Sequence, residues 1–193
     1  MPSPQQAERA AARVGLNLDN IQGDILCAFE IHGILDCNSH FHSVGMKKRK
    51  ELFLFFKINN KTLFKASIKA LRPLITTTKQ LLNAKSSSGS AVNIAFSQTG
   101  LNFLGVTEDL KDDAFRAGQA QDANNLGDPG TKNWVDAFKG NKVHGVVLVA
   151  ADNNLRLLAK VAQVKLLLGL SVSELYTLQG AARPGNQEGH ERK

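Results

Sequence analysis

The 193-residue sequence is poor in the residues that support covalent or aromatic chemistry, with two cysteines, one tryptophan and one tyrosine. Two cysteines close at most one disulfide, so a disulfide-rich scaffold is excluded, but so small a number does not identify the redox compartment. The sequence also has no Gly-x-Ser-x-Gly elbow, no phosphate-binding loop and no His-Glu-x-x-His motif. These absences argue against the hydrolase, nucleotide-binding and metalloprotease classes that such motifs mark.

Long hydrophobic runs are also missing. The most apolar stretch, residues 143–151, is shorter than the roughly 20 residues that cross a bilayer as a helix. Residues 3–8 lack the basic and apolar regions of a secretory signal. We therefore expect no membrane partner, and a protein that is either cytoplasmic or secreted by an unconventional route.

The chain has the size and composition of one globular domain, with an excess of positive charge. It is 42% hydrophobic and 21% charged, and its net charge is +7. The densest basic cluster, which would suit an anionic or cell-surface partner, consists of Lys47, Lys48, Arg49 and Lys50. Basic residues also commonly flank a buried strand, and no aromatic platform or zinc-finger spacing accompanies this cluster, so nucleic-acid binding is not favoured.

Hydrophobic periodicity predicts the first strands and helix. Residues 51–58 are apolar on both alternating sets, which is typical of a strand covered on both faces. A helix is expected to start at Asn60, because apolar residues recur at helical spacing as far as Ile75 while lysines take the other side. After a Ser/Gly-rich break at residues 86–90, residues 91–96 predict a second strand.

The second half of the chain has the same kinds of element after a long polar excursion. Residues 101–106 predict a short helical turn, and residues 107–142 an irregular segment anchored by Trp134 and Phe138. Residues 143–151 are apolar on both faces and predict a central third strand.

The last predicted elements are a helix and a strand. Asp152 or Asn153 is expected to cap the helix, which Gly169 ends, and residues 172–178 predict the fourth strand. The order strand, helix, strand, strand, helix, strand is that of a single ferredoxin-like α+β domain with a four-stranded antiparallel sheet and both helices on one face. The predicted organisation is an N-terminal arm at 1–50 containing an inserted loop at 27–43, the domain at 51–181, and a tail at 182–193.

The face of the sheet away from the helices is the predicted interaction surface. The two central strands are apolar on that face too, so a missing domain, a second copy of the chain or a ligand is expected to cover it. We therefore expect a homo-oligomer or a missing second half as partner. The surface is predicted to comprise Phe53, Phe55, Val146, Leu148 and the basic residues Lys47, Lys48, Arg49 and Lys50.

Two terminal motifs carry a resemblance to a known family. The stretch NLDNIQGDIL at residues 17–26, together with RPGNQEGHE at residues 183–191, resembles fungal dye-decolorizing heme peroxidases. Residues 93–97, Trp134 and residues 144–146 agree with the same family. The resemblance implies two ferredoxin-like halves with heme between their sheets, an aspartate in a Gly-x-x-Asp-Gly motif, and a proximal histidine and distal arginine in the second half.

The sequence departs from that family in its catalytic parts. It contains no Gly-x-x-Asp-Gly motif, which the resemblance places just after Glu191, and it ends at Lys193. We therefore expect the first half of a longer enzyme, with no catalytic residue, no bound heme or other cofactor, and no metal in this chain. His144 is expected to be a hydrogen-bonded structural histidine, and His190 lies on the terminal segment.

Residues 27–43 break the family pattern, and their deletion restores it, which suggests translated non-coding sequence such as a retained intron. The segment also gathers soft and imidazole ligands, namely Cys27, His32, Cys37, His40 and His42. Their spacing does not match the usual paired-ligand zinc patterns, so a mobile loop is the simpler interpretation. A disulfide between Cys27 and Cys37 remains an alternative in an oxidising setting.

Three functions stay open at this point. The first is a non-catalytic interaction protein that binds through the uncovered sheet face. The second is a heme peroxidase that is active only when dimerisation or a second half completes it. The third is a cationic protein that acts on cell-surface polysaccharide or receptors. The paired carboxylates at residues 108–109 and 112–113 are interpreted as solvated loop residues rather than as a catalytic pair.

Overall fold

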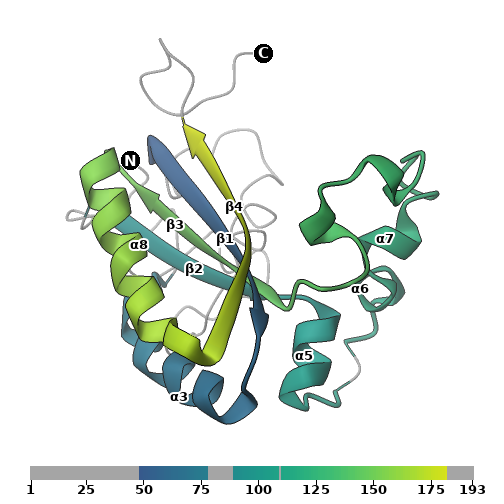
Figure 1. Ribbon diagram of the computed structural model, residues 1–193, viewed down its shortest axis with the longest axis horizontal. Coiled ribbons are helices and arrows are strands. Elements are labelled where there is room, and N and C mark those ends of the chain that lie inside the picture. Colours follow the sequence, from purple (N-terminus) through teal and green to yellow (C-terminus); the bar gives the residue numbers. More distant parts are fainter. Residues whose placement is uncertain (1–47, 78–88, 109, 182–193) are drawn as a thin grey trace, which may run out of the picture.

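The computed structural model describes residues 48–77, 89–108 and 110–181 (Figure 1). The predicted N-terminal arm before residue 48, the cysteine- and histidine-containing segment 27–43, and the tail 182–193 lie outside these residues. The described elements are β1 (Lys50–Ile58), α3 (Lys61–Leu71), η1 (Arg72–Leu74), β2 (Ser90–Phe96), α5 (Gln98–Leu104), α6 (Asp113–Ala117), α7 (Gln119–Asp122), η2 (Thr131–Asn133), η3 (Asp136–Phe138), β3 (Gly145–Ala151), α8 (Asn154–Leu168), η4 (Gly169–Ser171) and β4 (Val172–Ala181).

The four strands form one antiparallel sheet in the order β2-β3-β1-β4. The central positions belong to β1 and β3, the two strands whose residues are apolar on both alternating sets. This order, with α3 and α8 as the two crossover helices, confirms the predicted ferredoxin-like α+β fold.

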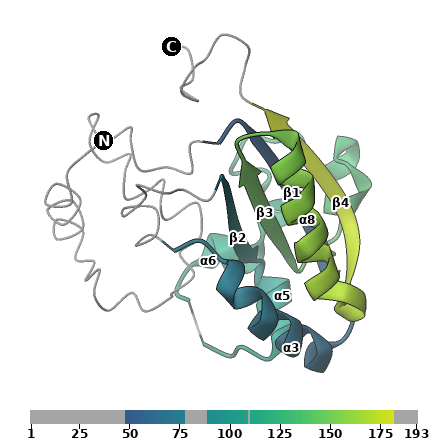
Figure 2. The same cartoon turned by 90° about the vertical axis from the view of Figure 1, so that its left-hand side faces the viewer.

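The helices α3 and α8 lie side by side on one face of the sheet (Figures 1 and 2). Asn60 caps α3, because its side chain accepts a hydrogen bond from the Leu63 N–H at 3.0 Å. Asn153 caps α8 by accepting from the Arg156 N–H at 2.9 Å, which decides between the two predicted caps. Neither helix is long and apolar enough to span a bilayer, nor is any other helix within the described ranges.

The hydrophobic core fills the space between this helix pair and the sheet. Every second residue of β1 from Leu52 to Ile58 points into it, and Phe56 is fully buried against Phe64 of α3 at a ring-centroid distance of 5.6 Å. Leu157 and Val164 of α8 are equally inaccessible. The register of the sheet therefore follows from one continuous set of inward-facing residues.

Three predicted boundaries were wrong by a few residues. The helix predicted at 101–106 begins at Gln98, because the Ser97 hydroxyl caps it by accepting from the Gly100 N–H at 3.1 Å. The third strand begins at Gly145 rather than residue 143, since the backbone at His144 bonds to the corner between β2 and α5. The fourth strand runs three residues further than predicted, because β1 offers it a partner as far as Lys50.

The polar excursion between β2 and β3 forms α5, two shorter helices and two 3-10 turns. Figure 1 shows it on the side of the sheet away from α8. Trp134 anchors it as predicted, since its Nε1 donates to the Asp128 carboxylate at 3.0 Å while the same carboxylate accepts from the Gly130 N–H. The excursion is thus an ordered structure with its own polar contacts.

Candidate interaction surface

The predicted apolar surface is a set of cross-strand rows on the sheet face opposite the helices. In one row Phe53 pairs with Leu148, and in the next Phe55 pairs with Val146. These four predicted residues therefore lie together, as expected. Strand β2 extends the first row with Asn93, which is a buried polar residue opposite Leu148. Adjacent rows of apolar side chains on a sheet form a continuous surface.

Aromatic rings concentrate on one part of this face. The Phe55 ring meets Phe138 of η3 edge-on at a centroid distance of 4.8 Å and lies 6.3 Å from the Tyr176 ring of β4. Phe138 and Tyr176 are 5.4 Å apart, and Phe53 stacks on Phe55 at 6.4 Å. We call these four residues, Phe53, Phe55, Phe138 and Tyr176, the aromatic cluster.

The aromatic cluster makes the face less open than the sequence predicts. All four of its residues are half-buried, because the excursion folds back and lays Phe138 over the sheet. Sequence reasoning identified Phe138 only as an anchor of the loop and did not include Tyr176 in the surface. The alternation of the fourth strand could have identified Tyr176 as part of the surface, because it places that residue on the same face as Leu178. Leu178, at 47% exposure, is the large apolar side chain of this face most open to solvent.

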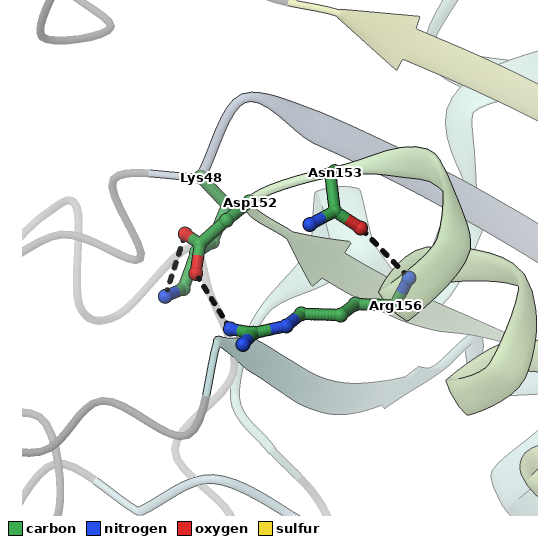
Figure 3. Close-up of polar contacts among 4 residues, drawn as sticks. All are labelled: Lys48, Asp152, Asn153 and Arg156. Atoms are coloured by element: carbon green, nitrogen blue, oxygen red, sulfur yellow. Dashed lines mark hydrogen bonds and ion pairs between the residues drawn. The ribbon is translucent and has the colours of Figure 1, made fainter.

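The predicted basic residues lie at and before the start of β1. Lys47 lies outside the described residues, Arg49 is exposed, and Lys50 is the first residue of β1. The Lys48 ammonium donates to the Asp152 carboxylate at 3.0 Å, although 104 residues separate them in the sequence. Figure 3 shows that this carboxylate also faces Arg156 of α8, at 3.5 Å.

The ion pairs tie the start of β1 to the start of α8. The Lys48 side chain is 8% exposed, so it is held against the protein rather than extended into solvent. A cation in that position is poorly placed to meet a large anionic partner. The structure therefore gives Lys48 a stabilising contact, and its role in binding stays a prediction.

His144 is a buried, hydrogen-bonded residue, which confirms its predicted structural role. Its Nδ1 accepts from the Ile58 N–H at 3.2 Å, and its backbone joins β1 to the corner before α5 through Phe56 and Ser97. The Phe103 ring covers it at a centroid distance of 5.0 Å. Burial, and secondarily the positive charge of Lys57, lower the pKa of His144.

This hydrogen bond also bears on the heme that the resemblance implies. An Nδ1 that accepts from a backbone N–H carries no proton, so in the neutral ring the proton is on Nε2. A histidine that ligates heme iron uses an unprotonated nitrogen and usually donates from the other one. Since His144 is the one histidine within the described ranges, that part of the chain does not fit an axial histidine ligand.

The carboxylates at residues 112–113 have local structural roles, whereas the predicted pair at 108–109 reaches outside the described residues. Asp112 caps α6 by accepting from the Phe115 N–H at 2.8 Å, and Asp113 lies 3.4 Å from Arg116 in an exposed pair. Among the residues that the structure describes, no three His, Cys, Asp or Glu side chains gather as a metal site would require. The cysteine- and histidine-containing segment 27–43 lies outside those residues.

Comparison with known proteins gives a consistent family. A family model described as the DyP dimeric alpha+beta barrel domain matches residues 43–184. The match starts at the end of the segment 27–43, whose origin as an insertion remains a prediction, as do the predicted domain boundaries. The crystal structure of a decolorizing peroxidase from Auricularia auricula-judae superposes with a TM-score of 0.71 at 42% identity, over 77% of this chain and 33% of that chain.

Curated fungal proteins are similar over almost the whole sequence. Peroxidase 2 of Mycetinis scorodonius is 49% identical over 193 residues, covering 99% of this chain and 34% of that protein. A dye-decolorizing peroxidase of Auricularia auricula-judae is 40% identical over 191 residues, covering 98% of this chain and 34% of that protein. The chain thus spans about a third of the length of the curated relatives it matches. With its central residues matched by the family model and its fold shared with a solved member, the chain belongs to the dye-decolorizing peroxidase family.

Proposed function

We propose that this chain provides one α+β half of a dye-decolorizing peroxidase and packs its aromatic sheet face against a second α+β domain. The observation that carries the proposal is the pair of apolar rows built from Phe53, Phe55, Val146 and Leu148, on a sheet whose other face is already covered by helices. An apolar sheet face of this kind is stabilised by burial against another layer.

The comparisons support the proposal that this chain is one part of a longer peroxidase. The relatives that are named as peroxidases are about three times as long as this chain, so about two thirds of each lies outside the match. Peroxide-dependent oxidation of a dye is therefore proposed for the assembled protein. The role of the 193 residues themselves is association.

The described residues by themselves support a non-catalytic role. Their histidine, His144, accepts from the Ile58 N–H, and Asp112 and Asp113 form a helix cap and an ion pair within the excursion. General acid or base catalysis needs a titratable group that can reach the reacting atoms.

The test combines molar mass with heme absorbance on the full chain. We expect the isolated protein to self-associate through the sheet face, and Leu148→Glu to lower its mass in light scattering by placing a charge among apolar rows. The matched control is Leu126→Glu, since Leu126 is exposed in the excursion. We expect added heme to give no histidine-ligated Soret band and no dye oxidation with peroxide.

Two outcomes would contradict the proposal. A wild-type monomer whose mass Leu148→Glu leaves unchanged would show that the sheet face does not associate. A histidine-ligated heme spectrum with peroxide-dependent dye oxidation by the isolated chain would show that the chain is a complete enzyme. Circular dichroism of both variants separates loss of association from loss of folding.

A further inference from the structure

The outer side of the helix layer carries a second group of apolar residues, which the core does not use. On α8 and the following turn η4, four leucines are between 58% and 90% exposed: Leu155, Leu158, Leu166 and Leu170. Leu63 of α3, in the same layer, is 51% exposed. Singly exposed leucines are common on protein surfaces, but a clustered set indicates an interaction site.

The α8 leucines are aligned along one side of the helix. At 100° per residue, Leu155, Ala162 and Leu166 fall within about 20° of a common direction. The buried residues of α8, such as Leu157 and Val164, point to the opposite side, toward the sheet. The helix is therefore apolar on two sides, of which the sheet covers only one.

Basic side chains border this stripe, and the helices contain no acidic residue. On α8, Arg156 and Lys165 lie about 100° and 80° from Leu155 and flank the leucines, whereas Lys160 lies about 140° away, toward the buried side. Helix α3 adds Lys65 and Lys69, while the Lys61 ammonium lies close to Gly105 at the end of α5. Neither Lys61–Leu71 nor Asn154–Leu168 includes an aspartate or glutamate. Figure 2 looks onto this layer and shows the two helices next to each other.

Acidic groups from neighbouring elements offset part of this charge. Asp152 faces Arg156 at 3.5 Å, and Glu174 of β4 faces Lys165 at 2.8 Å. Lys160 is hydrogen-bonded to the neutral Gln163. The layer retains a net positive charge from α3 and from the middle of α8.

We propose that the outer side of the helix layer, formed by Leu63, Leu155, Leu158, Leu166 and Leu170 with the flanking lysines, docks on the surface of an anionic lipid bilayer. In this arrangement α8 lies in the plane of the interface and its leucines enter the acyl boundary. The long aliphatic stems of Arg156 and Lys165 follow them while their charged groups stay at the headgroups. Anionic headgroups attract such cations within a Debye length of the surface.

The charges favour this partner over two others. A second copy of the chain would bring like-charged helices together, which opposes self-association through this face. A soluble polyanion would bind the lysines but would not account for the exposed leucines. A bilayer satisfies both groups and needs no groove in the protein. The expectation of no membrane partner came from the lack of a spanning segment, which a helix lying on the surface does not need.

The experiment measures co-sedimentation of the full chain with large vesicles. We expect binding to vesicles of 70:30 phosphatidylcholine and phosphatidylserine, and little to phosphatidylcholine alone. Raising the salt from about 0.1 M to about 0.5 M should weaken the binding, because it shortens the Debye length. The variant L155Q/L158Q/L166Q/L170Q should bind at least about tenfold more weakly, since it removes apolar area and leaves the charge unchanged.

The matched control is L126Q/V135Q, which changes exposed apolar residues of the excursion and should bind like the wild type. Both variants alter exposed positions, and unfolding curves would verify that they fold. Equal binding by the leucine variant and the wild type would overturn the proposal in favour of charge attraction alone. Failure of the wild type to bind either vesicle would overturn it outright, as would a wild-type dimer that the leucine variant converts to a monomer.

Discussion

Both faces of the sheet carry large apolar residues, but they are buried to different degrees. Successive residues of β1 show the contrast, since Phe56 is fully buried beneath the helices whereas Phe55, its neighbour, is half-buried in the aromatic cluster. The helix-covered face is closed by α3 and α8, each of which is adjacent in sequence to a strand it covers. The aromatic face is reached by a ring from a loop, Phe138.

This difference shows what hydrophobic patterning specifies. A strand that is apolar on both sides indicates that both faces of the sheet are buried. The layer that buries each face can come from a neighbouring element or from another domain. Here the nearby helices complete one face within the chain. The other face keeps the rows of Phe53 and Phe55 for a partner.

The largest effect is expected from truncating the buried ring on the helix side. Phe56→Ala should lower the free energy of unfolding by about 3–5 kcal/mol, because it leaves a cavity between Phe64 and Phe96. Phe53→Ala, on the other face of the same strand, should cost less than about 2 kcal/mol in the isolated chain, since that ring is half-buried. Urea unfolding measures both. Equal losses would show that the aromatic face is as closed as the helix-covered one.

A smaller effect is expected at His144, next to the excursion that supplies Phe138. His144→Leu should cost about 1–3 kcal/mol at neutral pH, because it leaves the buried Ile58 N–H without an acceptor. His144→Gln, whose amide oxygen can accept the same bond, is the control. Its free energy of unfolding should lie between those of the leucine variant and the wild type.

The same residue predicts the direction of a pH effect. The pKa of His144 is lowered in the folded state, so the unfolded state binds more protons and acid favours unfolding. Stability should be complete above the unfolded pKa of about 6.5 and decline as the pH falls below it. Lys57 adds positive charge near the ring, while α5, packed against it, contributes no charged residue. Urea titrations of wild type and His144→Gln test this, and parallel pH profiles would contradict it.

The smallest effects are expected at the start of α8, at the edge of the helix layer. Asn153→Ala should cost about 1 kcal/mol, because it removes the side-chain cap of the Arg156 N–H. Asp152→Asn should cost about 0.5–1 kcal/mol, because it weakens the contacts with Lys48 and Arg156. Salt distinguishes the two in thermal unfolding. High salt should shrink the effect of Asp152→Asn and leave that of Asn153→Ala unchanged.

The sequence predicted the fold well where one periodicity dominates. Residues 51–58 have a strand pattern that only a central position explains, and Asn60 combines a capping residue with a helical repeat. The same local signals placed Phe53 and Leu148 on one face, because alternation in a strand decides the side on which each residue lies. Such features depend on neighbours in the sequence.

Features that depend on long-range contacts were harder to predict from the sequence. No local sequence pattern predicts that Lys48 meets Asp152 or that Phe138 packs on Phe55. Each contact joins residues far apart in the sequence, and it depends on how the segment between them folds. The exposed leucines of α8 are a second example. Leu155, Leu158 and Leu166 are apolar like the buried residues of the helix, and only a structure separates the side that meets the sheet from the side that meets solvent.

The hydrogen bonds at His144 have one more consequence, for how the excursion could change. The chain leaves the sheet at Ser97 and returns at His144, where the Ser97 N–H donates to the His144 carbonyl at 3.1 Å and its hydroxyl donates to the Val143 carbonyl. The last ladder pair before that point is Phe96 with Gly145. Strands β2 and β3 thus form one hairpin that is closed at Ser97 and His144. We therefore expect that the segment between them could change in length or sequence without shifting the register of the two strands.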